Sequence, residues 1–431
     1  MRRFIVVVVA AGVFAAFFTV SVFAETVDVK LGGEIRVRGE SVGSDGPGTK
    51  GMVLQRTRIN VDAQVNENVK AYIQVQDSRT WGRDGATNGT GTSGDELTTI
   101  SALGDKVTVD NRADIKQAYF HLDKIIDQPL SVRVGRQVMA YGDHRLIGHL
   151  EWSNNGRSFD ALKLMYNAET FSADLWSARI YETTTTSSDS DFNGIYATYK
   201  GIPSNTVDLY YLQDLVAKSV AAGAPNSAND VNKGRDVSTY GLRLNGKLAD
   251  LDYTGEIAMQ GGTRTDTGTK VSQEASAYAV KAGYTLKDIM GLRVGAEYDS
   301  ATGDDSGTAD KKEDFQNLYH TNHSLYGFTD DINWTNIKAF AIVASLKPVE
   351  GLWLGAEYWN YTAAKVASGV SDNLGNEMNL MARYPLHESV KLEATWVRRT
   401  AGEGGGKDYY GNSLAKDKIS DFIYLSGNVV F

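Results

Sequence analysis

Residues 58–65 read Arg58-Ile59-Asn60-Val61-Asp62-Ala63-Gln64-Val65, an alternation of polar and apolar side chains. Successive side chains of a β-strand point to opposite faces, so this pattern predicts a strand with one polar and one apolar surface. The same alternation recurs along the chain and predicts eighteen strands. They comprise residues 32–40, 55–65, 69–76, 113–122, 130–141, 159–166, 172–181, 194–200, 207–213, 239–248, 252–260, 276–286, 292–299, 337–346, 352–361, 377–384, 390–397 and 419–431.

The connections between these strands alternate in length. Short ones such as 66–68 and 124–129 alternate with long polar ones such as 80–111 and 300–335. Tight periplasmic turns and long extracellular loops are typical of outer-membrane barrels. A soluble sandwich is the alternative, but eighteen strands carry more apolar face than one sandwich core needs. We therefore predict an all-β fold, a single antiparallel transmembrane barrel with an aqueous lumen.

The apolar faces end in aromatic residues, as membrane-facing strands do. Leu292, Val294 and Ala296 share one predicted face with Tyr298, and aromatic rings settle at the level of the lipid headgroups. The chain ends in Phe431, preceded by apolar residues at alternate positions, which resembles the insertion signal of bacterial outer-membrane proteins. The lipid bilayer and lipopolysaccharide are therefore the expected surroundings.

Composition and the first residues indicate the compartment. The chain has 431 residues, no Cys and a formal net charge of −9, which makes nucleic acid an unsuitable partner and excludes Cys-ligated zinc. Arg2 and Arg3 precede an apolar stretch from Phe4 to about Val20, and Val22 and Ala24 fit the −3 and −1 positions of a cleavage site, which predicts a signal peptide over residues 1–24. A retained anchor helix is the alternative. Residues 25–431 are then the barrel in the outer membrane of a Gram-negative bacterium.

The polar faces should line the lumen, and they are rich in arginine. Acidic residues share these faces, so cross-strand ion pairs on a wet wall are one interpretation. A basic wall that attracts anionic solutes, with infolded loops 80–111 and 300–335 setting its diameter, is the other. The predicted lumen residues include Arg36, Arg38, Arg58, Arg133, Arg243, Arg293 and Arg383.

Arg136 interrupts the alternation of its strand. Leu130, Val132 and Val134 point to lipid, and Arg136 would follow them at a cost of roughly 2–4 kcal/mol at mid-membrane depth. We therefore expect a bulge near Gly135 that turns Arg136 into the lumen.

Two stretches resemble a known family. They are Gly135-Arg136-Gln137 through Gly156-Arg157-Ser158-Phe159-Asp160, with Trp152-Ser153-Asn154 between them, and Thr321-Asn322-His323. The chain resembles the alginate-export family of outer-membrane channels, eighteen-stranded barrels of which the best-known member exports a uronate polysaccharide through an arginine-lined constriction. The resemblance implies that Arg136, Arg145, Arg157 and Asp160 face the pore or brace the loop entering it.

Motifs for other chemistry are weak. His320 and His323 lack an acidic or Cys partner at metal-ligand spacing, and Asp189-Ser190-Asp191 begins like a calcium loop but has Lys200 where the bidentate Glu belongs. We expect no cofactor, no metal and no catalytic residue. The predicted function is a channel for passive passage of anionic or polar solutes, with polyuronate as the solute that the resemblance implies. A barrel protease or lipase, and a scaffold for a periplasmic partner, are the alternatives.

Overall fold

The computed structural model describes residues 27–45, 48–81, 113–182, 189–216, 234–266, 269–305, 307–409 and 411–431. The predicted signal peptide and nearly all of the predicted infolded loop 80–111 lie outside these residues. Within the described ranges, no helix combines the length and apolar character needed to cross a membrane.

Strands make up most of the described chain. Their bounds are β1 (Asp28–Ser44), β2 (Gly48–Asn66), β3 (Val69–Thr80), β4 (Ala113–Leu122), β5 (Leu130–Gln137), β6 (Phe159–Asn167), β7 (Phe171–Tyr181), β8 (Ser190–Tyr199), β9 (Asn205–Val216), β10 (Arg235–Leu248), β11 (Leu251–Asp266), β12 (Thr269–Leu286), β13 (Leu292–Ala301), β14 (Lys311–Lys312), β15 (Ile337–Val349), β16 (Leu352–Ala363), β17 (Asn373–His387), β18 (Val390–Ala401), β19 (Gly406–Lys407), β20 (Ser413–Leu414) and β21 (Ile419–Val430). One 3₁₀ turn, η1 (Ile125–Asp127), precedes β5.

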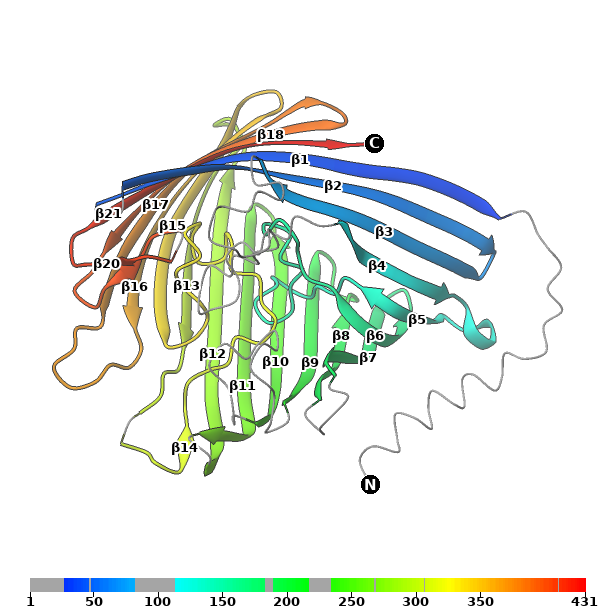
Figure 1. The fold of residues 1–431 in the computed structure, drawn as a ribbon, viewed down its shortest axis with the longest axis horizontal. Coiled ribbons are helices and arrows are strands. Elements are labelled where there is room, and N and C mark those ends of the chain that lie inside the picture. Colours follow the sequence, from blue (N-terminus) through cyan, green and yellow to red (C-terminus); the bar gives the residue numbers. More distant parts are fainter. Residues whose placement is uncertain are drawn as a thin grey trace, which may run out of the picture.

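The main sheet closes on itself. It has nineteen strands, and without the two-residue β14 eighteen remain, each antiparallel to its neighbours. β21 pairs with both β18 and β1, and this last pairing joins the two ends of the sheet (Figure 1). Gly33 N–H also donates to the carbonyl of Phe431 across 2.8 Å. The predicted eighteen-stranded barrel is confirmed, and each predicted strand overlaps one of these long strands.

The two faces of the wall differ as the alternation predicts. On β1, Arg36 and Arg38 are buried while Leu31 and Ile35 are exposed. Exposed aromatic rings gather on the outer face near the short turns and again towards the long loops. The first group includes Tyr166, Phe171, Tyr199, Tyr284 and Tyr384, and the second Tyr211, Tyr240, Tyr278, Tyr298 and Tyr358. These two belts mark the interfaces of a membrane-spanning barrel.

The buried core lies inside the barrel, between the wall and two infolded connections. Residues 302–336 contribute Phe315, Tyr319 and Trp334 to it, as expected for a loop that enters the lumen. Residues 138–158, between β5 and β6, also fold inward and bury Leu146 and Ile147. An isolated bridge between Ile147 and Tyr319 joins the two connections, so they enter the lumen as one packed unit.

Candidate functional site at the infolded loop

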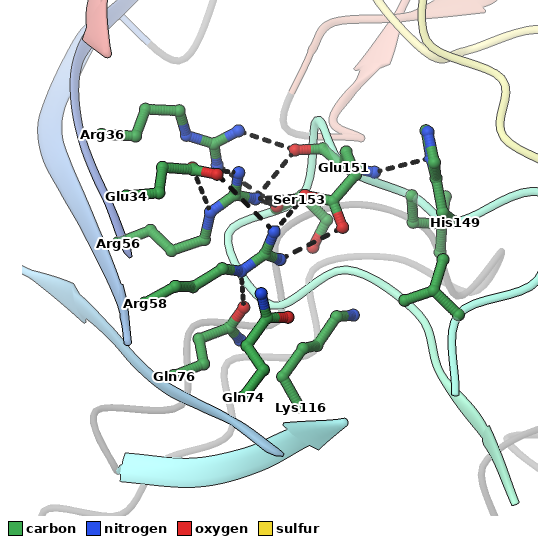
Figure 2. A network of polar contacts seen from close by, with 12 residues as sticks. Glu34, Arg36, Arg56, Arg58, Gln74, Gln76, Lys116, His149, Glu151 and Ser153 are labelled. Atoms are coloured by element: carbon green, nitrogen blue, oxygen red, sulfur yellow. Dashed lines mark hydrogen bonds and ion pairs between the residues drawn. The ribbon is translucent and has the colours of Figure 1, made fainter. Parts of the chain in front are cut away.

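Four arginines on two neighbouring strands face the infolded loop 138–158. Arg36 and Arg38 lie on β1, Arg56 and Arg58 on β2, and Arg36 is the direct cross-strand partner of Arg56. Because side chains alternate along a strand, even-numbered positions of both strands share the inner face. Each of the four side chains is buried. Figure 2 shows Arg36, Arg56 and Arg58 one above another, with Glu151 of the loop facing them.

The loop backbone accepts hydrogen bonds from these arginines. Arg36 donates to the carbonyl of Glu151 at 2.6 Å, Arg38 to that of Trp152 at 2.7 Å, and Arg56 to that of Glu151 at 3.0 Å. Arg36 also reaches the carbonyl of Ser153 at 3.2 Å. Backbone carbonyls are neutral, so these bonds hold the loop in place without cancelling the positive charge.

Carboxylates neutralise only part of that charge. Arg38 pairs with Glu40, Arg56 with Glu34, and Arg58 with Glu151, each at 2.6 Å. Arg36 lies opposite Arg56 in this group of arginines. Among the described residues, no carboxylate lies within ion-pair distance of Arg36.

A fifth cation, Lys116 of β4, completes this group. Its Nζ is buried and has no hydrogen-bond partner in the described part of the chain. We call Arg36, Arg38, Arg56, Arg58 and Lys116, with Glu34, Glu40 and Glu151, the arginine cluster. Five cations against three carboxylates leave it a formal charge of +2.

A β-bulge brings Lys116 into the cluster. The pairing of β3 with β4 shifts between Gln74 and Val75, so that Lys116 is the extra residue on β4. Sequence analysis missed it. The sequence signal for the bulge is the pair of apolar residues Ile115 and Phe120. Five residues apart, they would lie on opposite faces of a regular strand, but both are exposed on the outer face.

Charge in the cluster controls the ionisation of Glu151. Burial alone would raise the pKa of this carboxyl, but Arg56 and Arg58 outweigh that effect and lower the pKa to about 2. Glu151 is therefore a carboxylate at any physiological pH.

Ring stacking and one arginine hold the two infolded connections together. The Trp152 ring lies parallel to that of His323, with centroids 3.6 Å apart, and the Arg38 guanidinium covers Trp152 at 3.7 Å. Arg157 donates to the carbonyls of Gly148, Tyr319 and His320, with the last bond at 2.7 Å. Arg157 thus links its own loop to the second infolded connection.

The far side of the loop is tied to the opposite wall. Arg145 of the loop pairs with Glu297 and, at 2.9 Å, with Asp299 on β13. Arg243 of β10 bridges Asp143 of the loop at 2.5 Å and Asp208 of the wall at 3.0 Å. These two arginines are paired, so they match the interpretation of charges that pair across the wet wall.

A cavity of about 350 Å³ lies beside Arg243, where the loop is tied to β10. Tyr141, Asp174, Asp208 and Arg243 are among its lining residues. Acidic and basic groups both reach this space, so the lumen next to the loop is polar without a single dominant charge.

The remaining predicted lumen arginines lie near the short-turn end. The Arg133 guanidinium lies over the Tyr119 ring at 4.4 Å, Arg293 pairs with Asp252 at 2.6 Å, and Arg383 pairs with Glu393 at 3.1 Å. None of the three belongs to the arginine cluster.

The expected inward turn of Arg136 is wrong. Asp160 follows Phe159 on β6, and Phe159 packs on Phe192 and Tyr319 inside the barrel, so Asp160 points outward. Arg136 is the cross-strand partner of Asp160 and pairs with it at 3.2 Å. The two side chains are 43% and 57% exposed, so neither belongs to the lumen.

The register explains why Arg136 stays outside. The ladder from Leu130 to Gln137 pairs with β6 without a shift, so the alternation is never reversed. Gly135 does have an unusual backbone, with φ of +126°, but it adds no residue to the strand. Arg136 lies one residue from the long-loop end of β5. The penalty for arginine on the outer face is small at this end of the strand, near the membrane interface.

A family model described as alginate export matches residues 27–414, most of the chain. The chain belongs to the alginate export family. No curated protein sequence matches it.

Solved structures support the fold of this alginate export family member. Pseudomonas aeruginosa OpdL is 12% identical with a TM-score of 0.61, covering 94% of this chain and 99% of its own. Pseudomonas aeruginosa OccK9 (OpdG) is 13% identical with a TM-score of 0.60, covering 95% and 100%. Acinetobacter baumannii OccAB4 is 10% identical with a TM-score of 0.57, covering 93% and 98%. At such identities the likeness concerns the fold alone.

Fold and family together define the class of protein. A closed barrel with two aromatic belts, in a chain of the alginate export family, is an outer-membrane channel. Within it, the arginine cluster is where a net formal charge is buried against a loop that folds into the lumen.

Proposed function

We propose that this channel passes anionic solutes by diffusion, and that the arginine cluster selects them. The observation that carries the proposal is the formal charge of +2 at a buried position, in a chain whose net charge is −9. A low-dielectric wall focuses the field of such a cluster into the lumen and raises the local concentration of anions.

Carboxylates are the anions that this cluster suits best. Guanidinium groups bind carboxylates through paired hydrogen bonds, which gives both geometric selectivity and strength. Arg56 binds Glu34 through two nitrogens, Nε at 3.1 Å and Nη2 at 2.6 Å. Sugar acids, and polyuronates as their polymers, carry this group, and the family to which the chain belongs is described as alginate export.

Planar-bilayer recording of the refolded protein tests the proposal. Under a KCl gradient we expect a reversal potential that favours chloride over potassium. Arg36→Ala should lower this preference by about twofold, because it removes a cation that no carboxylate neutralises. Arg136→Ala is the matched control, since it removes the same charge from the outer face and should leave the reversal potential unchanged.

Two outcomes would contradict anion selection. Cation selectivity of the wild-type protein, or no conductance at all, would overturn it. An equal shift in Arg36→Ala and Arg136→Ala would remove the arginine cluster from its role.

A barrel enzyme and a scaffold for a periplasmic partner are the competing functions. Membership of the alginate export family favours a channel over both. Hydrolysis of a peptide or a lipid ester by the refolded protein would support the enzyme, and co-purification with a periplasmic protein would support the scaffold.

A further inference from the structure

Glu151 occupies the position in the arginine cluster that a carboxylate from outside would occupy. Its Oε2 lies 2.6 Å from Arg58 and 3.1 Å from Arg56, and its Oε1 accepts from Arg58 at 3.1 Å. Unlike Glu34, which projects from β1, Glu151 belongs to the loop 138–158. The loop thus presents its own carboxylate to the two arginines.

Lys116 lies close to Glu151 but does not pair with it. A Cβ added to Gly156 would meet Lys116 Nζ at 2.6 Å and Glu151 Oε1 at 3.1 Å. The two atoms are therefore less than about 6 Å apart, and the backbone of Gly156 and the carbonyl of His149 lie beside them. A rotation of the Glu151 side chain is enough to bring its carboxylate to the ammonium group.

The lack of a side chain at Gly156 keeps this space open. Its φ is +66°, a left-handed conformation that glycine adopts without strain. A buried ammonium without a partner is costly, and a counter-ion that reaches it removes that cost.

We propose that Glu151 is a tethered counter-ion that a solute carboxylate displaces from Arg56 and Arg58, and that Lys116 receives the displaced Glu151. This inference rests on the proposed function. No covalent bond changes: the ion pair of Glu151 with the arginines breaks, and two ion pairs form, one between the solute and the arginines and one between Glu151 and Lys116.

The exchange leaves neither Glu151 nor Lys116 without a partner. Before it, Glu151 pairs with the arginines and Lys116 is alone. After it, the solute pairs with the arginines and Glu151 with Lys116. A solute therefore gains entry to the arginines without leaving a buried carboxylate unpaired.

Competition by a tethered group also lets the solute leave. A channel must bind its solute well enough to admit it and weakly enough to release it. Because Glu151 is attached to the loop, it returns at a high effective concentration and limits the residence of the solute on the arginines.

Block of KCl current by glucuronate in planar bilayers tests the exchange. In Glu151→Gln the half-blocking concentration should fall by about tenfold, since no carboxylate competes for the arginines. In Glu34→Gln, which removes an equal charge from the wall, the fall should be clearly smaller.

Lys116→Met supplies the second test. When the rest of the chain is wild type, the half-blocking concentration should rise, because displaced Glu151 then has no cation to receive it. In the Glu151→Gln background, Lys116→Met should have little effect on the half-blocking concentration, because no carboxylate is displaced that could pair with Lys116. Unheated electrophoretic mobility in detergent checks that each variant forms the barrel.

The outcomes separate the two proposals. Failure of the wild-type protein to select anions would overturn the proposed function itself. If the wild-type selects anions, equal effects of Glu151→Gln and Glu34→Gln would overturn the exchange, as would an equal effect of Lys116→Met in both backgrounds, which would mean that Lys116 binds the solute directly.

Discussion

Gly135 has a backbone conformation that other residues rarely adopt. Its φ is +126°, and a Cβ at this position would lie 2.3 Å from the carbonyl oxygen of Ala118 on the neighbouring strand. The glycine therefore serves the close contact between β4 and β5. It does not redirect Arg136.

The change Gly135→Ala should destabilise the barrel. Backbone strain alone costs about 1–3 kcal/mol, and the contact with Ala118 adds to it. Urea unfolding of the protein in lipid vesicles, followed by tryptophan fluorescence, should show a lower midpoint. Gly255→Ala is the control, because a Cβ there meets nothing within 4 Å. Equal midpoints for the two variants would contradict the assigned conformation.

At the scale of elements, loop 138–158 carries two histidines whose protonation should oppose its docking. His144 and His149 lie edge to face, with centroids 4.5 Å apart. Burial lowers the pKa of both. Arg243 lowers that of His144 further while Asp143 opposes it. For His149, the neighbouring His144, Lys116 and Arg58 lower the pKa and Glu151 opposes them.

The sign of the pH effect follows from these shifts. An undocked loop has histidines with a pKa of about 6.5, so below that pH it binds more protons than the docked loop. Docking of the loop is therefore most favourable above about pH 6.5. It becomes less favourable as the pH falls from there towards the lowered pKa values of the docked histidines. Glu151 and Asp143, each with a pKa lowered to about 2 by neighbouring cations against the effect of burial, stay charged in this window.

We expect acidification from about pH 7 to 5 to loosen the loop and raise single-channel conductance. The double variant His144→Gln, His149→Gln should lose most of this dependence. His387→Gln, an exposed histidine at the end of β17, should keep it. Equal pH dependence in all three proteins would show that these histidines do not control the loop.

The whole molecule is held in the membrane by its outer face. Leu425 lies midway along β21 and is 63% exposed, and Leu248 beside the short turn after β10 is 69% exposed. Depth in the bilayer, and not exposure, distinguishes them.

Leu425→Arg should cost roughly 2–4 kcal/mol of stability and Leu248→Arg roughly 0–1 kcal/mol, because the penalty for arginine falls from the midplane to the interface. Urea unfolding from vesicles measures both. Similar losses would mean that Leu425 does not face the hydrocarbon.

The wall of the barrel was predictable from the sequence, residue by residue. Alternation and the lengths of the connections predicted the eighteen-stranded barrel because each is a local property of the chain. The inward direction of Arg36, Arg38 and Arg58 followed from the same period of two. The position of Arg136 would also have been right without the added bulge, since the plain alternation already placed it outside.

The pairing of charges in the lumen was decided by tertiary structure. Glu151 meets Arg58, 93 residues away, and Lys116 joins them through a bulge on a third strand. No local period relates these residues, because the loop that carries Glu151 is placed by bonds to walls on both sides of the barrel. The sequence thus determined a barrel with arginines on its inner face, and only the folded loop determined how those charges are paired.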